Sequence, residues 1–204
     1  VVILGHYNVG KTSIIKCLEN NEFKQEQATV GVEFSEYNVD YIDPNTDNKL
    51  IISLQIWDTC KLLIKTNLAG AERYKAVTSG HVRNADAAIL VFDLTDKKSF
   101  DELNYWLECI NKFNKDIIVY LFGNKVDLGE ICIETEILNE FISLNKIKSY
   151  YSTSAKNKIN IREAFNKLSV DVCEIGLKNL NTHRINNLRK KEKRIEEIKK
   201  DKCC

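Results

Sequence analysis

The chain has 204 residues, of which 44% are hydrophobic and 29% are charged. These values are ordinary for a globular protein and suit one domain with some chain left over. No apolar run approaches the roughly 18 residues that a transmembrane helix needs, so we expect no membrane span. The chain opens Val1-Val2-Ile3-Leu4 and contains no Met. We therefore expect no signal peptide and a start that lacks a few residues.

The net charge of +1 hides an asymmetry. Residues 178–204 carry ten Lys or Arg against four Asp or Glu, a net charge of +6, so the rest of the chain carries −5. The acidic body argues against nucleic acid as a partner. The basic tail can meet an anionic membrane surface. Its composition favours a solvated or disordered tail, and the alternative is a helix that continues from the core.

The seven cysteines do not form a recognisable framework, because their number is odd and no Cys-x-x-Cys occurs. This pattern fits a reducing compartment and argues against both a disulfide scaffold and a zinc site. We expect three of them, which lie in helical patterns, to be small core residues. These are Cys17, Cys109 and Cys173. The histidines are scattered, and we expect them to face solvent; they are His6, His81 and His183.

Strand-like and helix-like segments alternate along the first part of the chain. A buried strand is predicted over Val1–Leu4 and a helix over Lys11–Glu19. Two further strands are predicted, Glu33–Ile42 from its alternation of apolar and polar residues and Leu50–Trp57, and they flank a turn cluster at residues 43–48. This arrangement predicts an antiparallel hairpin.

The alternation continues to residue 176. Buried strands are predicted at Ala87–Phe92 and Ile117–Phe122, and a short strand at Lys148–Ser152. Three helices are predicted, the first behind Ser99 as its N-cap. Their apolar positions are Phe100, Leu103, Leu107 and Ile110, then Ile137, Leu138, Phe141, Ile142 and Leu144, and last Ala164, Phe165, Leu168 and Val172. We therefore predict an α/β fold with a mostly parallel six-stranded sheet, one antiparallel edge strand and helices on both faces. The domain would span residues 1–176, followed by a basic tail over 177–204.

Residues 5–12 match G-x-x-x-x-G-K-[ST] between a predicted strand and a predicted helix. This context separates the pattern from a chance glycine-rich turn. The glycines let backbone N–H groups face a polyphosphate, and the helix N-terminus adds partial positive charge. Lys11 supplies a point charge for the outer phosphates, and the Thr12 hydroxyl is a Mg²⁺ ligand. The candidate binding residues are Gly5, Asn8, Val9, Gly10, Lys11, Thr12 and Ser13. This loop alone leaves ATP and GTP open.

A second motif, Asn124-Lys125-Val126-Asp127, narrows the nucleotide. It follows a predicted buried strand, so it lies at the carboxyl edge of the sheet, where ligands bind. The Asp127 carboxylate can accept hydrogen bonds from the ring N–H and exocyclic amine of guanine. Adenine would leave that carboxylate unpaired, at a cost of about 1–3 kcal/mol. Ser154-Ala155-Lys156 follows the last predicted strand and adds a backbone N–H at the same edge.

With these motifs in place, the chain resembles the small GTPases, and within them the Rab family, over residues 1 to about 176 and at its last two residues. The further stretches that carry the resemblance are Thr29–Phe34, Leu54–Thr59, Glu72-Arg73-Tyr74 and Val91–Asp96. The resemblance implies a GTP- and GDP-binding switch that uses Mg²⁺, hydrolyses GTP and serves vesicle-mediated membrane traffic. It implies effector proteins, an exchange factor and an activating protein that meet the switch loops. We expect a monomer that cycles between the cytosol and the cytoplasmic face of endomembranes.

The resemblance also assigns roles to single residues. Thr29 would close over Mg²⁺ and the outer phosphate, Asp58 would hold Mg²⁺ through water, and Gly70 would sense the outer phosphate. Thr29 and Gly70 are thus the catalytic candidates. Phe23 would cover the guanine, although the stretch from Phe23 to Thr29 is one residue shorter than the family pattern. The guanine pocket would consist of Asn124, Lys125, Asp127, Ser154, Ala155 and Lys156. The aromatics Phe34 and Trp57 would belong partly to the core and partly to the effector surface.

Two positions depart from the family in ways that bear on catalysis. Ala71 stands where the family has a Gln that orients the attacking water, and a methyl group cannot hydrogen-bond water. Tyr7 stands where most relatives carry a smaller residue, so its ring could obstruct a catalytic residue supplied by a partner. We expect slow hydrolysis, and a hydrolysis-deficient GTP-binding scaffold for effectors remains an alternative. An ATP-using P-loop enzyme is disfavoured by Asp127.

A nine-residue insertion, Cys60–Leu68, interrupts the family spacing Asp-x-x-Gly between Asp58 and Gly70. Possible codons let the inserted segment begin with GT and end with AG, over a length divisible by three. Its excision would restore Asp58-Thr59-Ser-Gly70. The sequence therefore leaves two hypotheses open, a translated intron and a real loop that rebuilds the second switch.

The chain ends in Cys203-Cys204 behind its basic segment. This ending resembles the double geranylgeranylation signal of Rab proteins, and the alternative is a pair of exposed thiols. One lipid chain binds a membrane only marginally, whereas two chains, or one chain with a basic patch, anchor stably. The resemblance thus predicts lipidation of both cysteines.

Overall fold

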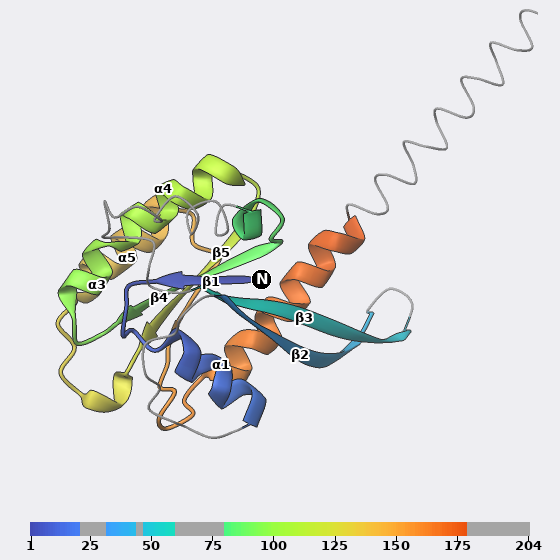
Figure 1. Cartoon of the computed structure of the whole chain (residues 1–204), viewed down its shortest axis with the longest axis horizontal. Helices are drawn as coiled ribbons and strands as arrows, with labels where there is room; N and C mark the ends of the chain where they lie inside the picture. The colour runs from blue at the N-terminus through green and yellow to red at the C-terminus, as the bar shows by residue number, and fades with distance from the viewer. Residues whose placement is uncertain (21–31, 44–46, 60–79, 179–204) are drawn as a thin grey trace, which may run out of the picture.

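The computed structural model describes residues 1–20, 32–43, 47–59 and 80–178. Figure 1 shows a central sheet with helices on both faces. The strands are β1 (Val2–Gly5), β2 (Val32–Ile42), β3 (Lys49–Thr59), β4 (Ala87–Asp93), β5 (Ile118–Asn124) and β6 (Ser149–Ser152). The helices are α1 (Lys11–Asn20), α3 (Lys97–Asp101), α4 (Leu103–Phe113), the 3-10 turn η2 (Val126–Leu128) and α5 (Thr135–Leu144). Helical residues also occupy 80–83 and 161–178.

The six strands form one sheet in the order β2-β3-β1-β4-β5-β6. The pairs β1–β3, β1–β4, β4–β5 and β5–β6 are parallel, and β2 pairs antiparallel with β3 at the edge. The predicted fold class is therefore confirmed. In the register of β4 and β5, Asp93 pairs with Asn124. Both strands thus end level with each other, and their last polar side chains meet at the carboxyl edge of the sheet.

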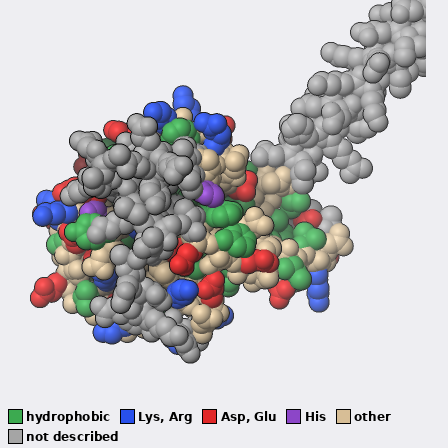
Figure 2. Space-filling view, viewed as in Figure 1, with side chains coloured by type: hydrophobic (Ala, Val, Ile, Leu, Met, Phe, Trp, Pro, Cys, Tyr) green, Lys and Arg blue, Asp and Glu red, His purple; other side chains and the backbone are tan. Residues whose placement is uncertain are grey.

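The β2–β3 hairpin presents one face to solvent, and Figure 2 shows hydrophobic and acidic side chains together over it. Phe34 pairs with Trp57 across the two strands, and their ring centroids lie 5.0 Å apart. The opposite face is covered, because Tyr37 contacts Phe165 and donates a hydrogen bond to Asn166 of the helix at 161–178. Since side chains alternate along a strand, Phe34 and Tyr37 lie on different faces of β2.

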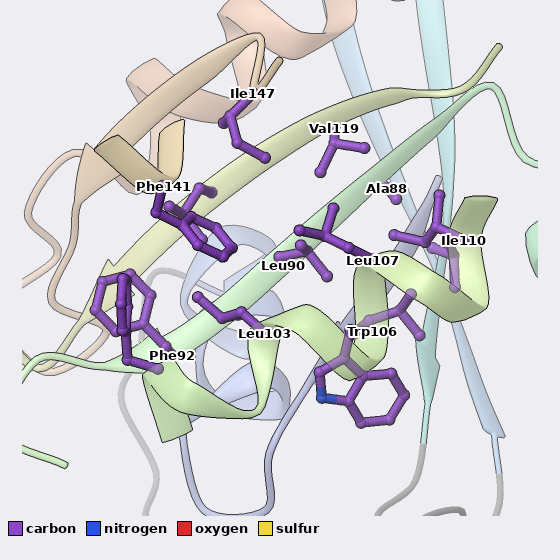
Figure 3. Close-up of a cluster of buried hydrophobic side chains, with 14 of the residues drawn as sticks. Ala88, Leu90, Phe92, Leu103, Trp106, Leu107, Ile110, Val119, Phe141 and Ile147 are labelled. Atoms are coloured by element: carbon purple, nitrogen blue, oxygen red, sulfur yellow. The ribbon is translucent and has the colours of Figure 1, made fainter. Parts of the chain in front are cut away.

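The buried strand β4 packs against helices on both sides, as its continuous apolar sequence predicts. On one side, Figure 3 shows Ala88, Leu90 and Phe92 of β4 beneath the apolar side chains of α4. On the other side, the intervening residues of β4 belong to a second cluster with α1 and the helix at 161–178. Because both faces are buried, the sheet lies between two helical layers. The loops that follow the strands lie at its carboxyl edge.

Two local predictions are corrected. The helix predicted behind Ser99 begins earlier, because Asp96 is the N-cap and its carboxylate accepts a hydrogen bond from the Lys98 N–H. Ser99 lies inside α3, fully buried, and its hydroxyl bonds to the backbone of Asp93 and Asp96. Of the cysteines expected in the core, Cys17 is buried, whereas Cys109 and Cys173 are only partly buried.

Within the described residues, no helix combines the length and the apolar character that crossing a membrane requires. The tail predicted over 177–204 lies outside the described residues beyond residue 178.

Candidate functional site

The loop from Gly5 to Lys11 joins β1 to α1, and its backbone explains its glycines. Gly5 has a φ of +148°, and a Cβ there would lie 2.1 Å from the Val91 carbonyl oxygen. Gly10 has a φ of +94°, and a Cβ there would lie 2.4 Å from the Asn124 side-chain nitrogen. Only glycine fits both the conformation and the space. Asn8 adopts a left-handed conformation with a φ of 60°, which Asn tolerates better than most residues.

Lys11 ends this loop and is the first residue of α1. Its side chain is buried, and its ammonium donates hydrogen bonds to the carbonyl oxygens of Gly5, at 3.0 Å, and His6, at 2.8 Å. The charge is therefore held at the helix N-terminus, where backbone N–H groups attract anions. A phosphate group would replace these carbonyls as the partner of the ammonium.

Thr12 and Asp58 meet beside this loop, where the sequence predicts Mg²⁺. The Thr12 hydroxyl donates a hydrogen bond to Asp58 Oδ2, while the buried Asp58 Oδ1 has no hydrogen-bond partner among the described residues. Burial raises the pKa of the Asp58 carboxyl, although the Thr12 hydrogen bond and the Lys11 charge act against the rise. Among the described residues, no group of three His, Cys, Asp or Glu gathers as a metal cage. A hydroxyl and one carboxylate with an unused oxygen fit Mg²⁺, which keeps waters and binds phosphates.

Asn124, the last residue of β5, organises the part of the site that the sequence predicts to bind guanine, here called the guanine side. Its amide nitrogen donates to the Val9 carbonyl at 2.8 Å, and so reaches the phosphate loop. Its amide oxygen accepts hydrogen bonds from the Ala155 N–H and from the Thr153 hydroxyl, each at 3.2 Å. The sequence predicts that the Ala155 N–H lies at this edge and is directed at the ligand. In this structure that N–H donates its hydrogen bond to Asn124. One side chain thus joins the phosphate loop to the loop after β6, which is distant from it in sequence.

The neighbouring residues extend the same network. The Ser154 hydroxyl donates to Asp127 Oδ1 at 2.5 Å, which orients the carboxylate expected to read guanine. Lys125 has a left-handed backbone, with a φ of 66°. Its ammonium lies 2.7 Å from Asp93 Oδ2, and Asp93 also accepts hydrogen bonds from the N–H and the hydroxyl of Thr95.

Asp93 is a site residue that motif reasoning missed. Its signal was available in the sequence, because Asp93 ends a buried parallel strand just as Asn124 does. Polar residues at that position face the ligand-binding edge of such sheets. Asp93 is buried, and its ion pair holds the Lys125 ammonium at the carboxyl edge of the sheet.

One prediction about the site is wrong. His6 does not face solvent, because it is 7% exposed and packs inside the phosphate loop. His81 is partly buried against Trp57, with ring centroids 4.4 Å apart. Of the remaining phosphate-loop candidates, Val9 is buried and Ser13 is partly buried, while Lys156 on the guanine side is exposed. The candidates Phe23, Thr29, Gly70, Ala71, Cys203 and Cys204, the insertion Cys60–Leu68, and His183 lie outside the described residues.

Known proteins are similar in sequence to this chain over most of its length. A family model described as the Ras family matches residues 1–174. The GTP-binding protein ypt3 of Schizosaccharomyces pombe is 36% identical over 177 residues, which are 85% of this chain and 75% of that protein. The Ras-related protein RABA4d of Arabidopsis thaliana is 37% identical over 178 residues, 86% of this chain and 73% of that protein. The Ras-related protein Rab-11C of Dictyostelium discoideum is 37% identical over 179 residues, 86% of this chain and 72% of that protein.

These matches agree with the geometry, in which a phosphate loop and a guanine-type loop meet at the carboxyl edge of a six-stranded sheet. The chain therefore belongs to the Ras family of GTPases, and within it to the Rab and Ypt small GTPases.

Proposed function

We propose that this chain is a GTP- and GDP-dependent switch in vesicle-mediated membrane traffic. The observation that carries the proposal is the Asn124 side chain, which joins the phosphate loop at Val9 to the guanine side at Ala155. A nucleotide with both a base and a polyphosphate is the ligand that spans these two regions. Purification followed by chromatography of the released nucleotide tests the assignment. GDP or GTP supports it, and ATP alone contradicts it.

In this proposal each side of the pocket has a separate task. The Lys11 ammonium moves from the carbonyls of Gly5 and His6 to the outer phosphates. The Asp127 carboxylate, oriented by Ser154, accepts the two guanine N–H groups. Thr12 and Asp58 would hold Mg²⁺, with Thr29 as a further candidate ligand. When bound, Mg²⁺ neutralises phosphate charge during transfer.

Partners would bind near the exposed face of the β2–β3 hairpin. Phe34 is 48% exposed, its ring centroid lies 5.0 Å from that of Trp57, and the Trp57 ring also contacts His81, with centroids 4.4 Å apart. Aromatic rings that contact one another on a surface are typical anchors of protein interfaces. An effector that reads the nucleotide state, an exchange factor and an activating protein are the expected partners.

Hydrolysis is the step on which the two functional hypotheses differ. A cycling switch needs a positioned water, whereas a hydrolysis-deficient scaffold does not, and Ala71 offers no hydrogen bond to water. We expect slow single-turnover hydrolysis in the wild type and a faster rate in Ala71→Gln. An unchanged rate in that variant would argue that Ala71 is not the limiting feature. The exposed Tyr7 ring is a second candidate cause, and Tyr7→Gly tests it with an activating protein present.

The insertion Cys60–Leu68 decides how the second switch is built. Strand β3 ends at Thr59, directly before it. Sequencing the transcript across Thr59–Gly70 distinguishes the hypotheses. A mature message that encodes Leu62-Leu63-Ile64 means that the loop is real, and its absence means that the segment is a translated intron.

Membrane attachment would depend on the chain end. We propose prenyl groups on Cys203 and Cys204, next to the basic tail, so that two lipid chains and a positive patch act together. Intact-mass measurement of protein from cells is the direct test. Replacement of both cysteines by Ser should move the protein from the membrane fraction to the soluble fraction. An unlipidated wild-type mass would contradict this part of the proposal.

A further inference from the structure

An ion pair between Asp93 and Lys125 connects the carboxyl ends of β4 and β5. Asp93 Oδ2 lies 2.7 Å from the Lys125 ammonium, and the Asp93 side chain is 9% exposed while that of Lys125 is 26% exposed. Asp93 belongs to neither nucleotide motif, and the family resemblance gives it no role. The pair therefore brings a buried carboxylate from outside the two motifs to a lysine that belongs to one of them.

The Asp93 carboxylate is held in place independently of Lys125. Its Oδ1 accepts hydrogen bonds from the Thr95 N–H, at 2.9 Å, and from the Thr95 hydroxyl, at 2.8 Å. The backbone N–H of Asp93 donates to the hydroxyl oxygen of Ser99 at 2.9 Å, and Ser99 is fully buried within α3. Because its own backbone and one of its oxygens are fixed in this way, Asp93 is a rigid anchor for whatever pairs with the other oxygen.

The backbone of Lys125 is also fixed, on both sides. Its φ of 66° is left-handed, a conformation that non-glycine residues seldom adopt and that persists where the surrounding structure enforces it. Before it, the Asn124 carbonyl accepts a hydrogen bond from the Leu94 N–H at 3.0 Å. After it, the Val126 N–H donates to the Thr153 carbonyl at 3.1 Å. Lys125 is thus held at its Cα by these backbone hydrogen bonds and at its ammonium by Asp93.

The aliphatic stem of Lys125 lies between these two fixed ends. A lysine stem has four carbons and many rotamers, so a lysine held at its backbone alone would sample several directions. Lys125 directly follows Asn124, which reaches the phosphate loop, and precedes Asp127, which is expected to read guanine. The stem is apolar and can cover a flat ring. Confining it before the ligand arrives lowers the entropy that binding costs.

We propose that Asp93 is a positioning residue for the nucleotide, because it holds the Lys125 ammonium and thereby keeps the lysine stem against the face of the base. The inference rests on the proposed binding of guanine nucleotides. Asp93 does not touch the nucleotide in this account and acts through Lys125. Without the ion pair the stem regains its rotamers, and bound GDP dissociates faster. The face of the ring is common to all purines, so this effect does not depend on the groups at the base edge that Asp127 reads.

The test is a double-mutant cycle on the dissociation rate of fluorescent GDP from the full chain with Mg²⁺. The proteins are the wild type, Asp93→Asn, Lys125→Met and the double variant. Asn keeps the shape of Asp and an acceptor for Thr95 but removes the charge that holds Lys125. Asp93→Asn should speed release about tenfold in the wild-type background, within the range of coupling between residues in contact. In the Lys125→Met background the same change should alter the rate by less than about twofold, because the residue through which Asp93 acts is absent.

A matched ion pair elsewhere in the chain provides the control. The Lys167 ammonium lies 2.7 Å from Oδ1 of the buried Asp171, in the helix at 161–178. Lys167→Met removes an ion pair of the same length from outside the site, so it should leave the rate of GDP release unchanged. Thermal unfolding without nucleotide checks that every variant is folded. Asp93→Ser, whose hydroxyl still offers an acceptor to Thr95, replaces Asp93→Asn if the latter unfolds.

Inosine diphosphate adds a second measurement, since it lacks the exocyclic amine that Asp127 would read. Asp93→Asn should speed the release of GDP and of inosine diphosphate by the same factor. A ratio of the two rates that differs from the wild-type ratio would mean that Asp93 acts on the reading of the base edge, which overturns the inference. An unchanged GDP rate in Asp93→Asn, or the same factor with Lys125 and with Met at that position, also overturns it. A wild type that binds no GDP contradicts the proposed function itself, and the inference with it.

Discussion

The guanine side and the phosphate side of the pocket are held together in different ways. On the guanine side the polar groups pair with one another, as Asn124 does with Ala155 and Asp127 with Ser154. On the phosphate side Lys11 is held by two backbone carbonyls, and one buried oxygen of Asp58 has no hydrogen-bond partner in the described part of the chain. On the guanine side, these polar groups already have hydrogen-bond partners within the protein. On the phosphate side, a ligand would be a better partner for the charged groups than the protein is.

This difference indicates where selectivity and where affinity originate. A preorganised guanine side loses little on binding, so it can discriminate between bases by the few groups that it directs at them. On the phosphate side, the Lys11 ammonium must exchange its backbone partners for phosphate oxygens. Binding there becomes more favourable because Mg²⁺ would pair with the buried Asp58 oxygen, which is costly to bury without a partner. We therefore expect substitutions to separate into those that change base choice and those that change overall binding or stability.

The largest effect is expected from Asn124→Ala, because Asn124 belongs to both sides. The change removes the hydrogen bond to Val9 and leaves the Ala155 N–H without its acceptor. We expect GDP to bind more weakly by about 2–4 kcal/mol, from two or more lost hydrogen bonds of about 1–1.5 kcal/mol each and a stranded buried carbonyl. Calorimetric titration measures the loss. Asn145→Ala is the control, because it removes one side-chain hydrogen bond at the end of α5, far from the pocket.

Asp127→Asn should affect only the guanine side. The amide cannot accept both guanine N–H groups, so the preference for guanine should fall by about 1–3 kcal/mol. Xanthine, whose edge offers a carbonyl in place of the amine, should bind better. Competition between GDP and XDP measures the change. Equal weakening of both nucleotides would mean that Asp127 acts through the structure rather than by reading the base.

Tyr120→Phe tests what anchors β5, the strand that carries Asn124. The Tyr120 hydroxyl is buried and donates to Asp171 Oδ2 at 2.5 Å, while Lys167 pairs with Oδ1 at 2.7 Å. Burial and the neighbouring Asp171 raise the pKa of Tyr120, so its hydroxyl remains a donor. Loss of a hydrogen bond to a charged group should lower the free energy of unfolding by about 2 kcal/mol at pH 7. Urea unfolding measures it.

The same variant has a pH signature. Burial alone would raise the pKa of Asp171, but the hydrogen bonds from Lys167 and Tyr120 outweigh burial and lower it below the ordinary value of 3.8. An acid whose pKa is lowered by folding stabilises the fold above its unfolded pKa, and this contribution is lost as pH falls through its folded pKa. The difference between wild type and Tyr120→Phe should therefore narrow below pH 3.8. A stability difference between wild type and Tyr120→Phe that grows as pH falls would contradict this account.

Asp58→Asn should give the smallest effect. The variant should be more stable than the wild type without Mg²⁺ and nucleotide, and less stable with them. Without Mg²⁺ or nucleotide, the neutral amide removes a buried carboxylate charge, so stability should rise by about 1 kcal/mol. For a chain of this size that gain raises the midpoint of thermal unfolding by about 2–4 °C. With Mg²⁺ and GDP the wild type should be the more stable protein. Asp101→Asn, on the exposed end of α3, is the matched control and should show neither change.

The sequence by itself determined the element types, the fold class and the two ligand motifs. Alternating strand and helix patterns predicted the sheet, since the continuous apolar run of β4 requires cover on both faces. The glycines of the phosphate loop and the position of Asp127 after a buried strand indicated a nucleotide site. The prediction of the fold succeeded because it depends on local spacing, which the chain encodes within a few residues, whereas the ligand roles of the two motifs stay predictions.

Only the tertiary structure decided which distant residues meet. Asn124 and Val9 are 115 positions apart, and their contact depends on the order of the strands, which periodicity does not encode. The ion pair of Asp93 with Lys125 depends on the register of β4 and β5. His6 was expected to face solvent, as one of three scattered histidines, but it is buried, and Glu102 from the α3–α4 junction lies 3.3 Å from its ring. Burial is a property of what packs against a residue, and for loop residues that partner comes from elsewhere in the chain.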